Sequence, residues 1–226
     1  SVEFSSTEPT LEIAQLIKAG VIVAIKGVGG FHIACDATNA KTVHQLRARK
    51  RRFDKPFALM ARDVTVIRRY ANVSTEEEVA LNTPAAPIVL LRRGGKCLAP
   101  EVAPHQTTLG FMLPYTPLHH LLMHELGTPI VLTSGNLSNE PQCITNDDAR
   151  TQLSLIADYG LLHNRDIVNR LDDSVIRFTT AAPQVIRRAR GYAPAPLQLP
   201  VGFENAPPVL AMGAALKSTF CLFRNG

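Results

Sequence analysis

Polar residues that could bind an anion directly follow an apolar run at residues 129–132, where the chain reads Thr133-Ser134-Gly135-Asn136. A buried strand ending there would bring a hydroxyl, a flexible glycine and an amide to one place. Ligands of open α/β sheets bind beyond the carboxyl ends of the strands. We therefore expect Ser134 and Asn136 to hydrogen-bond a ligand.

A cluster of cationic residues lies far upstream, between residues 47 and 55. Lys50 and Arg52 are two residues apart, so a continuous helix would point them to different sides. Lys55 precedes Pro56, and the residue before a proline avoids helical angles. We expect the helix to end near Arg49, which leaves Lys50 and Arg52 at a helix-to-strand exit, facing one anion. A solvated basic helix is the alternative.

The loop Lys26-Gly27-Val28-Gly29-Gly30 follows an apolar strand at residues 21–25. It lacks the third glycine of a dinucleotide fingerprint, which would fall at His32. Such a loop can still bring backbone N–H groups close to an anion, with Lys26 adding a charge. A plain strand-to-loop turn is the alternative.

Two further polar segments leave their roles open. Asp172 and Asp173 could hold Mg²⁺, orient arginines or be surface charges. In the last strand, alternation places Arg188 on one face with Arg190 and turns Arg187 to the other. An anion contact and a solvated edge both fit these arginines.

Three histidines lie on one predicted helix, at positions 119, 120 and 124. His120 and His124 are four residues apart, a spacing that can hold a metal. The HExxH order is missing and no third ligand is near in sequence. We predict a surface or partly buried histidine pair and no metal ligands.

Composition limits the class of protein. The 226 residues are 46% apolar and carry 24 Lys and Arg against 19 Asp and Glu, a formal charge of +5. This balance fits an anionic partner such as a nucleotide. The four cysteines form no CxxC pair and suggest reduced thiols in a cytoplasmic protein. The longest apolar run, residues 19–25, is too short to cross a membrane.

Hydrophobic periodicity predicts mixed strands and helices, hence an α/β or α+β fold with a mixed sheet. A proline-rich linker is expected at residues 194–208, between a nucleotide-binding domain at 1–193 and the opening hairpin of a truncated domain at 209–226. Helices are expected near 8–19, 38–46, 63–71, 74–81, 116–126 and 146–157. Strands are expected near 21–25, 56–60, 87–91, 109–113, 129–133, 161–162, 174–179, 184–188, 209–213 and 219–223.

Three ordered motifs carry a resemblance to a known family. Lys50-x-Arg52, Ser134-x-Asn136 and the strand at 173–176 resemble the YrdC-like domain, over about residues 8–193. The resemblance implies a twisted mixed sheet flanked by helices, with a concave basic cleft that binds ATP and makes acyl-adenylates.

Further motifs at 26–32, 46–50, 163–165 and 188–192 resemble the YrdC-like domain of the HypF family of hydrogenase-maturation carbamoyltransferases. Family members that make threonylcarbamoyl-adenylate carry a proline- and threonine-rich loop where this chain has glycines. Residues 210–213 with Leu216-Lys217 resemble the start of the HypF family's Kae1-like domain. The family's acylphosphatase and zinc-finger regions are not in the sequence, so a fragment is expected.

The resemblance implies that carbamate, released from carbamoyl phosphate, reacts with ATP and Mg²⁺ to give carbamoyl-adenylate and pyrophosphate. The carbamoyl group would pass to a cysteine of a HypE-type acceptor protein and end as a cyanide ligand of [NiFe] hydrogenase. Fixed cations must offset the repulsion between carbamate and the α-phosphate. No nucleophilic residue is needed.

The implied roles are as follows. Lys50 and Arg52 contact the triphosphate or carbamoyl oxygens, and Ser134 and Asn136 bind ligand oxygens. The small-substrate end is bordered by Lys26, Gly27, Gly29, Gly30 and His32. The phosphate shell is completed by Ser174 with Arg188 or Arg190.

Two other functions compete with this reading. One is a threonylcarbamoyl-adenylate synthase acting in tRNA modification. The other is a non-enzymatic module binding RNA, double-stranded RNA included. Nucleic acid is an unfavourable partner because aromatic residues are 6% of the chain, tryptophan is missing, and only Phe53 and Phe57 lie near the basic cluster.

Overall fold

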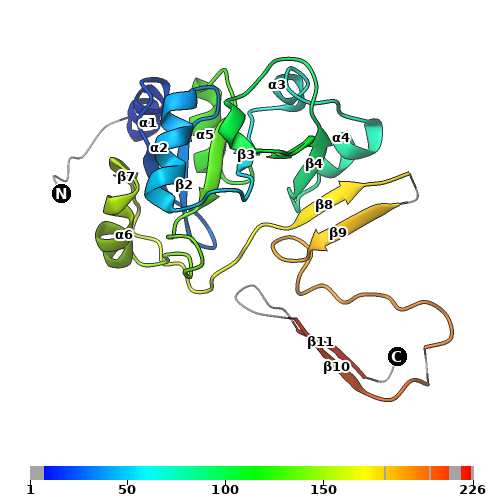
Figure 1. Cartoon of the computed structure of the whole chain (residues 1–226). Coiled ribbons are helices and arrows are strands. Elements are labelled where there is room, and N and C mark those ends of the chain that lie inside the picture. Colours follow the sequence, from blue (N-terminus) through cyan, green and yellow to red (C-terminus); the bar gives the residue numbers. More distant parts are fainter. Residues whose placement is uncertain (1–7, 181, 204, 214–219, 225–226) are drawn as a thin grey trace.

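The computed structural model describes residues 8–180, 182–203, 205–213 and 220–224. Leu216 and Lys217, which carry part of the resemblance, lie outside the described residues. A nine-stranded sheet runs through the main body in the order β7-β1-β2-β6-β3-β5-β4-β8-β9 (Figure 1). The pairs β1–β7, β3–β5 and β4–β8 are parallel and the other pairs antiparallel. The predicted mixed α/β fold is confirmed.

The strands are short and their bounds follow the apolar runs of the sequence. They are β1 (Val23–Lys26), β2 (Phe31–Asp36), β3 (Ala58–Met60), β4 (Ile88–Arg92), β5 (Thr108–Met112), β6 (Ile130–Ser134), β7 (Tyr159–Leu161), β8 (Val175–Phe178) and β9 (Pro183–Arg187).

Helices cover both faces of the sheet and enclose two apolar cores. Helices α1 and α5 pack over one face, where Val23, Ile25 and Leu132 point; the other helices cover the opposite face, with Ala24 and Val131. This alternation is the period-two pattern of a strand buried on both sides. The helices are α1 (Pro9–Lys18), α2 (Ala40–Lys50), α3 (Val64–Ile67), α4 (Thr75–Leu81), α5 (Pro117–Glu125) and α6 (Asn146–Gln152), with 3₁₀ turns at Pro100–Val102 and Leu153–Leu155.

The structure changes three of the expected elements. The helix expected at 63–71 ends as α3 at Ile67, and α6 is capped by Thr145 and gives way to a 3₁₀ turn after Gln152. Strand β2, which follows the glycine loop, is not among the expected strands. Strand β2 pairs with β6 in a register that sets His32 opposite Ser134.

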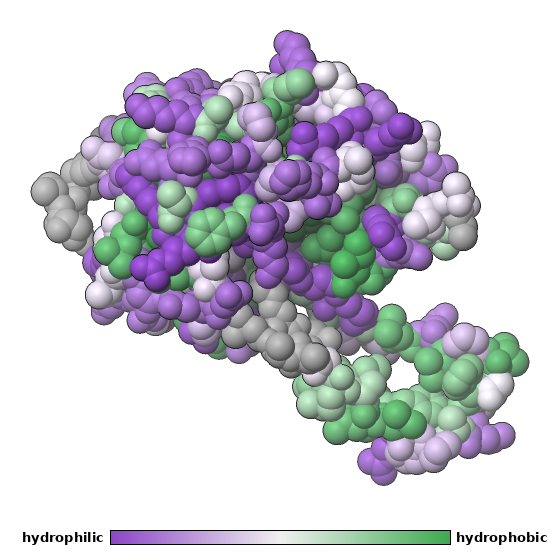
Figure 2. All heavy atoms as spheres, viewed as in Figure 1, coloured by the Kyte–Doolittle hydropathy of each residue, from purple (hydrophilic) through white to green (hydrophobic). Residues whose placement is uncertain are grey.

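Strands β10 (Val209–Met212) and β11 (Phe220–Phe223) form a separate antiparallel pair. Figure 1 places this hairpin beyond the main sheet, and Figure 2 shows it covered by apolar side chains. Leu210, Met212 and Phe220 are all exposed. The domain boundaries drawn at 193 and 208 remain predictions. In the described part of the chain, every helix is too short or too polar to cross a bilayer.

Candidate functional site

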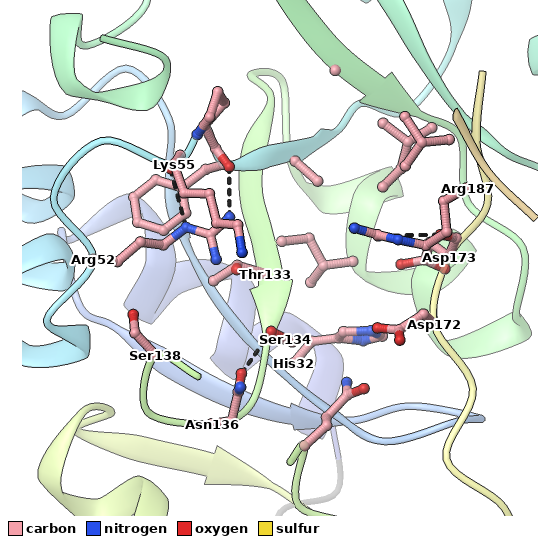
Figure 3. Close-up of a pocket in the computed structure, with 18 of the residues that line it drawn as sticks. His32, Arg52, Lys55, Thr133, Ser134, Asn136, Ser138, Asp172, Asp173 and Arg187 are labelled. Carbon is pink, nitrogen blue, oxygen red and sulfur yellow. Dashed lines mark hydrogen bonds between the residues drawn. The ribbon is translucent and has the colours of Figure 1, made fainter. Parts of the chain in front are cut away.

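A pocket of about 230 Å³ lies on the part of the sheet that α1 and α5 leave uncovered (Figure 3). Apolar side chains of β3, β4, β6 and β8 form its floor, and polar side chains form its rim. The floor includes Ala58, Ile88, Leu90, Leu132 and Val175; the rim includes His32, Arg52, Lys55, Thr133, Ser134, Asn136, Ser138, Asn139, Gln142, Asp172, Asp173 and Arg187. An apolar floor with a few convergent polar groups is typical of a small-molecule site.

The two motifs expected to share a ligand meet at this pocket. Helix α2 ends at Lys50, and Arg51 turns the chain in a left-handed conformation with φ of 52°. The predicted helix-to-strand exit is confirmed. The Nζ of Lys50 donates to the carbonyl oxygens of Ser134 (2.6 Å) and Asn136 (2.5 Å) and to Oδ1 of Asn136 (3.1 Å). These hydrogen bonds therefore join the C-terminal end of α2 to the C-terminal end of β6.

Lys50 lines the pocket as expected, but its side chain also makes contacts that the sequence did not predict. It is fully buried, and its ammonium, which has three protons, donates to the three oxygens just named. These three bonds hold the turn at residues 134–136 against the end of α2. A sequence cannot show that a lysine will be buried and paired with backbone carbonyls.

Ser134 and Asn136 form the end of β6 as expected. Ser134 Oγ donates to Asn136 Oδ1 at 2.6 Å, and Asn136 Nδ2 donates to the carbonyl of Glu140 at 2.5 Å. Both side chains line the pocket, although Asn136 is mostly buried. The turn therefore holds the Ser134 hydroxyl at the pocket surface.

Arg52 lies on one side of the pocket. Its Nε donates to the carbonyl of Lys55 at 3.1 Å and its Nη2 to that of Pro56 at 2.7 Å, while the guanidinium lies 5.3 Å from the ring centre of Phe57. Burial, with the nearby charges of Arg47 and Arg187, lowers the pKa of Arg52 to about 10. A cation held among other cations at a pocket wall is stabilised when an anion binds.

Arg187 lines the pocket and faces Arg52 across it (Figure 3). Its Nη1 lies 3.4 Å from the carbonyl of Asp173. Arg188, which was expected here, instead donates to the carbonyl of Ala195. Alternation separated Arg187 from Arg188 correctly, but it could not tell which face looks into the pocket.

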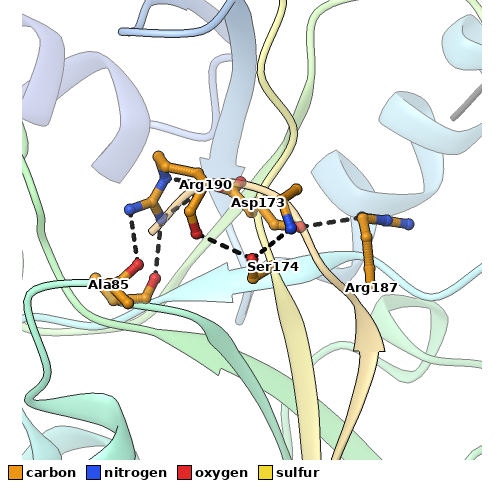
Figure 4. Close-up of polar contacts among 7 residues, drawn as sticks. Ala85, Asp173, Ser174, Arg187 and Arg190 are labelled. Atoms are coloured by element: carbon orange, nitrogen blue, oxygen red, sulfur yellow. Dashed lines mark hydrogen bonds and ion pairs between the residues drawn. The ribbon is translucent and has the colours of Figure 1, made fainter. Parts of the chain in front are cut away.

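Arg190 and Ser174 are also displaced from their expected roles, because both hold the chain together beside the pocket (Figure 4). Arg190 pairs with Asp173 at 3.0 Å, donates to the carbonyls of Ala85 and Ala86, and stacks 3.6 Å from the ring centre of Tyr115. Ser174 is fully buried; it donates to the carbonyl of Arg190 at 2.9 Å and accepts from the backbone N–H of residue 189 at 2.8 Å.

The structure places the glycine loop and Lys26 outside the pocket lining. Lys26 is buried and donates to the carbonyl of His163 at 3.0 Å. The N–H of Gly27 donates to the carbonyl of Gly30 at 3.0 Å, which closes the turn on itself. The loop's contribution to the pocket is His32, on the strand that follows it.

Two buried histidines lie near each other, His32 in the pocket lining and His119 outside it. The rings of His32 and His119 are 6.3 Å apart, and burial lowers the pKa of both, that of His119 to about 3. Among the described residues, neither nitrogen of His119 has a hydrogen-bond partner. His120 and His124 are exposed, as predicted, whereas His119 is a core residue.

No group of three or more His, Cys, Asp and Glu side chains is placed to hold a metal within the described residues. Asp173 orients Arg190, the second of the three roles considered for it. Asp172 lines the pocket. Because Mg²⁺ in nucleotide sites is held by one or two carboxylates and the phosphates, Asp172 is the side chain that fits such an ion.

Several pocket residues were missed at the sequence level. Lys55 belongs to the basic cluster and could have been included on that ground. Ser138 and Asn139 lie in the loop after β6, where strand-end reasoning points but spacing does not select a residue. Gln142 and Leu171 carry no recognisable signal, since only the tertiary fold brings them to the pocket.

The sequence matches the family model Sua5_yciO_yrdC, described as "Telomere recombination", over residues 15–189. Carbamoyltransferase HypF of Rhodobacter capsulatus is 55% identical over 213 residues, covering 94% of this chain and 28% of that protein. Threonylcarbamoyl-AMP synthase of Photobacterium profundum is 26% identical over 147 residues, covering 63% of this chain and 80% of that protein. A crystal structure of full-length HypF in the phosphate- and nucleotide-bound form superposes with a TM-score of 0.87 at 51% identity, covering 94% of this chain and 34% of that one.

The chain spans less than a third of the length of the curated carbamoyltransferases just compared, 28% in the Rhodobacter capsulatus protein. The family model, in contrast, covers well over half of this chain and includes every element of the pocket. The chain therefore belongs to the Sua5/YciO/YrdC family, as its three ordered motifs predicted.

Proposed function

We propose that this chain binds ATP in the pocket between Arg52 and Arg187 and joins carbamate to its α-phosphate. The observation that carries the proposal is the pair of guanidinium groups on opposite walls, with the Ser134 hydroxyl between them (Figure 3). Polyphosphate needs cations on more than one side, and arginine forks suit its oxygens. The 55% identity to a carbamoyltransferase of the HypF type supports carbamate as the acid.

The reaction has a simple balance. An oxygen of carbamate attacks the α-phosphorus and forms a new P–O bond, while the bond from that phosphorus to the β-phosphate oxygen breaks. Carbamoyl-adenylate and pyrophosphate result. The protein's task is to hold two anions in line and to offset their repulsion, so positioning and fixed positive charge supply the catalysis.

The residues divide these tasks by position. Arg52 and Lys55 on one wall and Arg187 on the other would bind phosphate oxygens. Ser134 would turn its hydroxyl proton from Asn136 Oδ1 to an oxygen at the reacting centre. Asp172 would share Mg²⁺ with the phosphates, and the ion would draw charge from the departing pyrophosphate.

We further propose that the carbamoyl group leaves as part of the hydrogenase cyanide-ligand pathway, by transfer to a cysteine of a HypE-type acceptor. Acylphosphatase, zinc-finger and Kae1-like regions of a longer protein would supply carbamate and carry out the transfer. A cytoplasmic location agrees with four cysteines, at 35, 97, 143 and 221, that are all unpaired.

Exchange of labelled pyrophosphate into ATP tests the proposal. Carbamoyl phosphate, or ammonium with bicarbonate as a direct source of carbamate, should support exchange, and Arg52→Ala should abolish it. Arg51→Ala is the matched control, because Arg51 is exposed and lies outside the pocket. Exchange that needs threonine plus bicarbonate would instead favour the threonylcarbamoyl-adenylate reaction. No exchange with any acid, together with salt-dependent RNA binding, would favour the binding module.

A further inference from the structure

Two side chains that line the pocket also cover the glycine loop at residues 27–30. Gln142 lies against Gly30, where an added Cβ would collide with its Cδ. The Nε2 of Gln142 donates to the carbonyl of Phe31 at 2.5 Å. The space that a side chain at position 30 would need is therefore already filled by Gln142.

Leu171 covers the neighbouring glycine in the same manner. Its N–H donates to the carbonyl of Gly29 at 3.0 Å, and a Cβ on Gly29 would lie 2.5 Å from the Cβ of Leu171. Arg170, which precedes Leu171 in the chain, links the two residues because its Nε donates to the carbonyl of Gln142 at 2.8 Å. Gln142 and Leu171 thus form one wall that lines the pocket together with His32, and Gln142 is bonded to the residue that precedes His32.

The position of this wall matters for the acid. His32 lies opposite Ser134 in the sheet, and Figure 3 shows His32 and Asp172 together, on the other side of Ser134 from Arg52 and Lys55. If the triphosphate spans the pocket from Arg52 to Arg187, with Asp172 sharing its Mg²⁺, the small acid lies toward His32. Gln142 is held by its bond to the carbonyl of Phe31 and Leu171 by the bond of its N–H to Gly29, so a methyl group that reached either side chain would be resisted.

We propose that Gln142 and Leu171 set the upper size of the acid, by filling the space into which a substituent on the carbamate nitrogen would extend. This inference rests on the proposed adenylation of carbamate and names what limits its substrate. The wall admits an unsubstituted carbamate and excludes the N-substituted carbamates that amines and amino acids form with bicarbonate.

Pyrophosphate–ATP exchange with a graded set of acids tests this inference. Bicarbonate is supplied with ammonium, methylamine, glycine or threonine. The wild-type chain should exchange with ammonium and at least tenfold more slowly with methylamine. Gln142→Ala and Leu171→Ala should raise the methylamine-to-ammonium ratio at least tenfold, and the double variant should extend exchange to glycine. Gln15→Ala and Leu121→Ala, on exposed positions of α1 and α5, are matched controls and should leave the ratio unchanged.

Folding does not confound this test. In Gln142→Ala the carbonyl of Phe31 keeps its 2.6 Å bond from the N–H of Gly135, and the milder Gln142→Asn and Leu171→Val should shift the ratio in the same direction. A wild-type chain that exchanges equally well with all four acids would overturn the inference, as would variants with an unchanged ratio. Absence of exchange with ammonium itself would instead overturn the proposed function.

Discussion

Replacement of Lys50 by methionine separates a positioning role from direct contact with the ligand. Methionine keeps most of the volume of the buried side chain but removes all three hydrogen-bond donors. Ser134 O retains a 3.1 Å bond from the N–H of Asn136, and Asn136 Oδ1 retains the Ser134 hydroxyl. The carbonyl of Asn136, in contrast, loses the 2.5 Å bond that it receives from Lys50.

The expected cost follows from these bonds. A buried polar group left without its partner costs about 1–3 kcal/mol, and two further oxygens lose one of their donors. We expect Lys50→Met to lower the free energy of unfolding by about 3 kcal/mol. For a chain of this size that is a fall in Tm of roughly 6–12 °C.

Urea unfolding of the wild type and two variants provides the assay. Lys55→Met is the matched control, because Lys55 also lines the pocket but is exposed. It should leave the free energy of unfolding within about 0.5 kcal/mol of wild type and weaken ATP binding. A Lys50→Met protein as stable as wild type, with ATP binding lost, would refute the reasoning and restore Lys50 as a ligand contact.

Three other substitutions test neighbouring parts of the account. Arg187→Ala should weaken ATP binding at least about tenfold, or about 1.4 kcal/mol, while Arg188→Ala should not; calorimetric titration that shows the reverse order would reject the placement. Ser174→Ala should cost about 1–3 kcal/mol of stability because two buried backbone groups lose their partner, and an unchanged urea midpoint would argue against this. His119 stays neutral in the fold with a pKa of about 3, so the unfolded chain binds the extra proton as pH falls below about 6.5 and stability decreases. From pH 7 to pH 5 wild type should lose about 2 kcal/mol more than His119→Leu; equal losses would contradict a neutral buried His119.

The sequence predicted the parts of the site that depend on local rules. The exit of α2 at Lys50 follows from the Lys55-Pro56 step, and the polar turn at residues 134–136 follows from the end of an apolar run. Both predictions concern backbone conformation within a few residues. The resemblance to the YrdC-like domain then joined these two distant segments, and the structure confirms that they meet.

The rest of the site depends on long-range packing, which local rules do not reach. Alternation along the strand predicts that Arg187 and Arg188 point to opposite faces of the sheet. Which of the two faces the pocket depends on the strand order and on the irregular register of the β8–β9 pair between Val175 and Ile176. Ser174 reads as a possible ligand contact because a hydroxyl fits either role. Its structural role becomes clear only in the folded chain, where Arg190 lies beside Ser174 and its carbonyl accepts the Ser174 hydroxyl.

The central claim is that a carbamate oxygen becomes bonded to the α-phosphorus of ATP in this pocket. Freshly dissolved ¹⁸O-labelled bicarbonate with ammonium gives labelled carbamate, and water then releases AMP from the adenylate by attack at the carbonyl carbon. Mass spectrometry should find ¹⁸O in the phosphate of that AMP for wild type and for Arg51→Ala, and none for Arg52→Ala. Unlabelled AMP from the wild type, or ADP as the product, would contradict the claim.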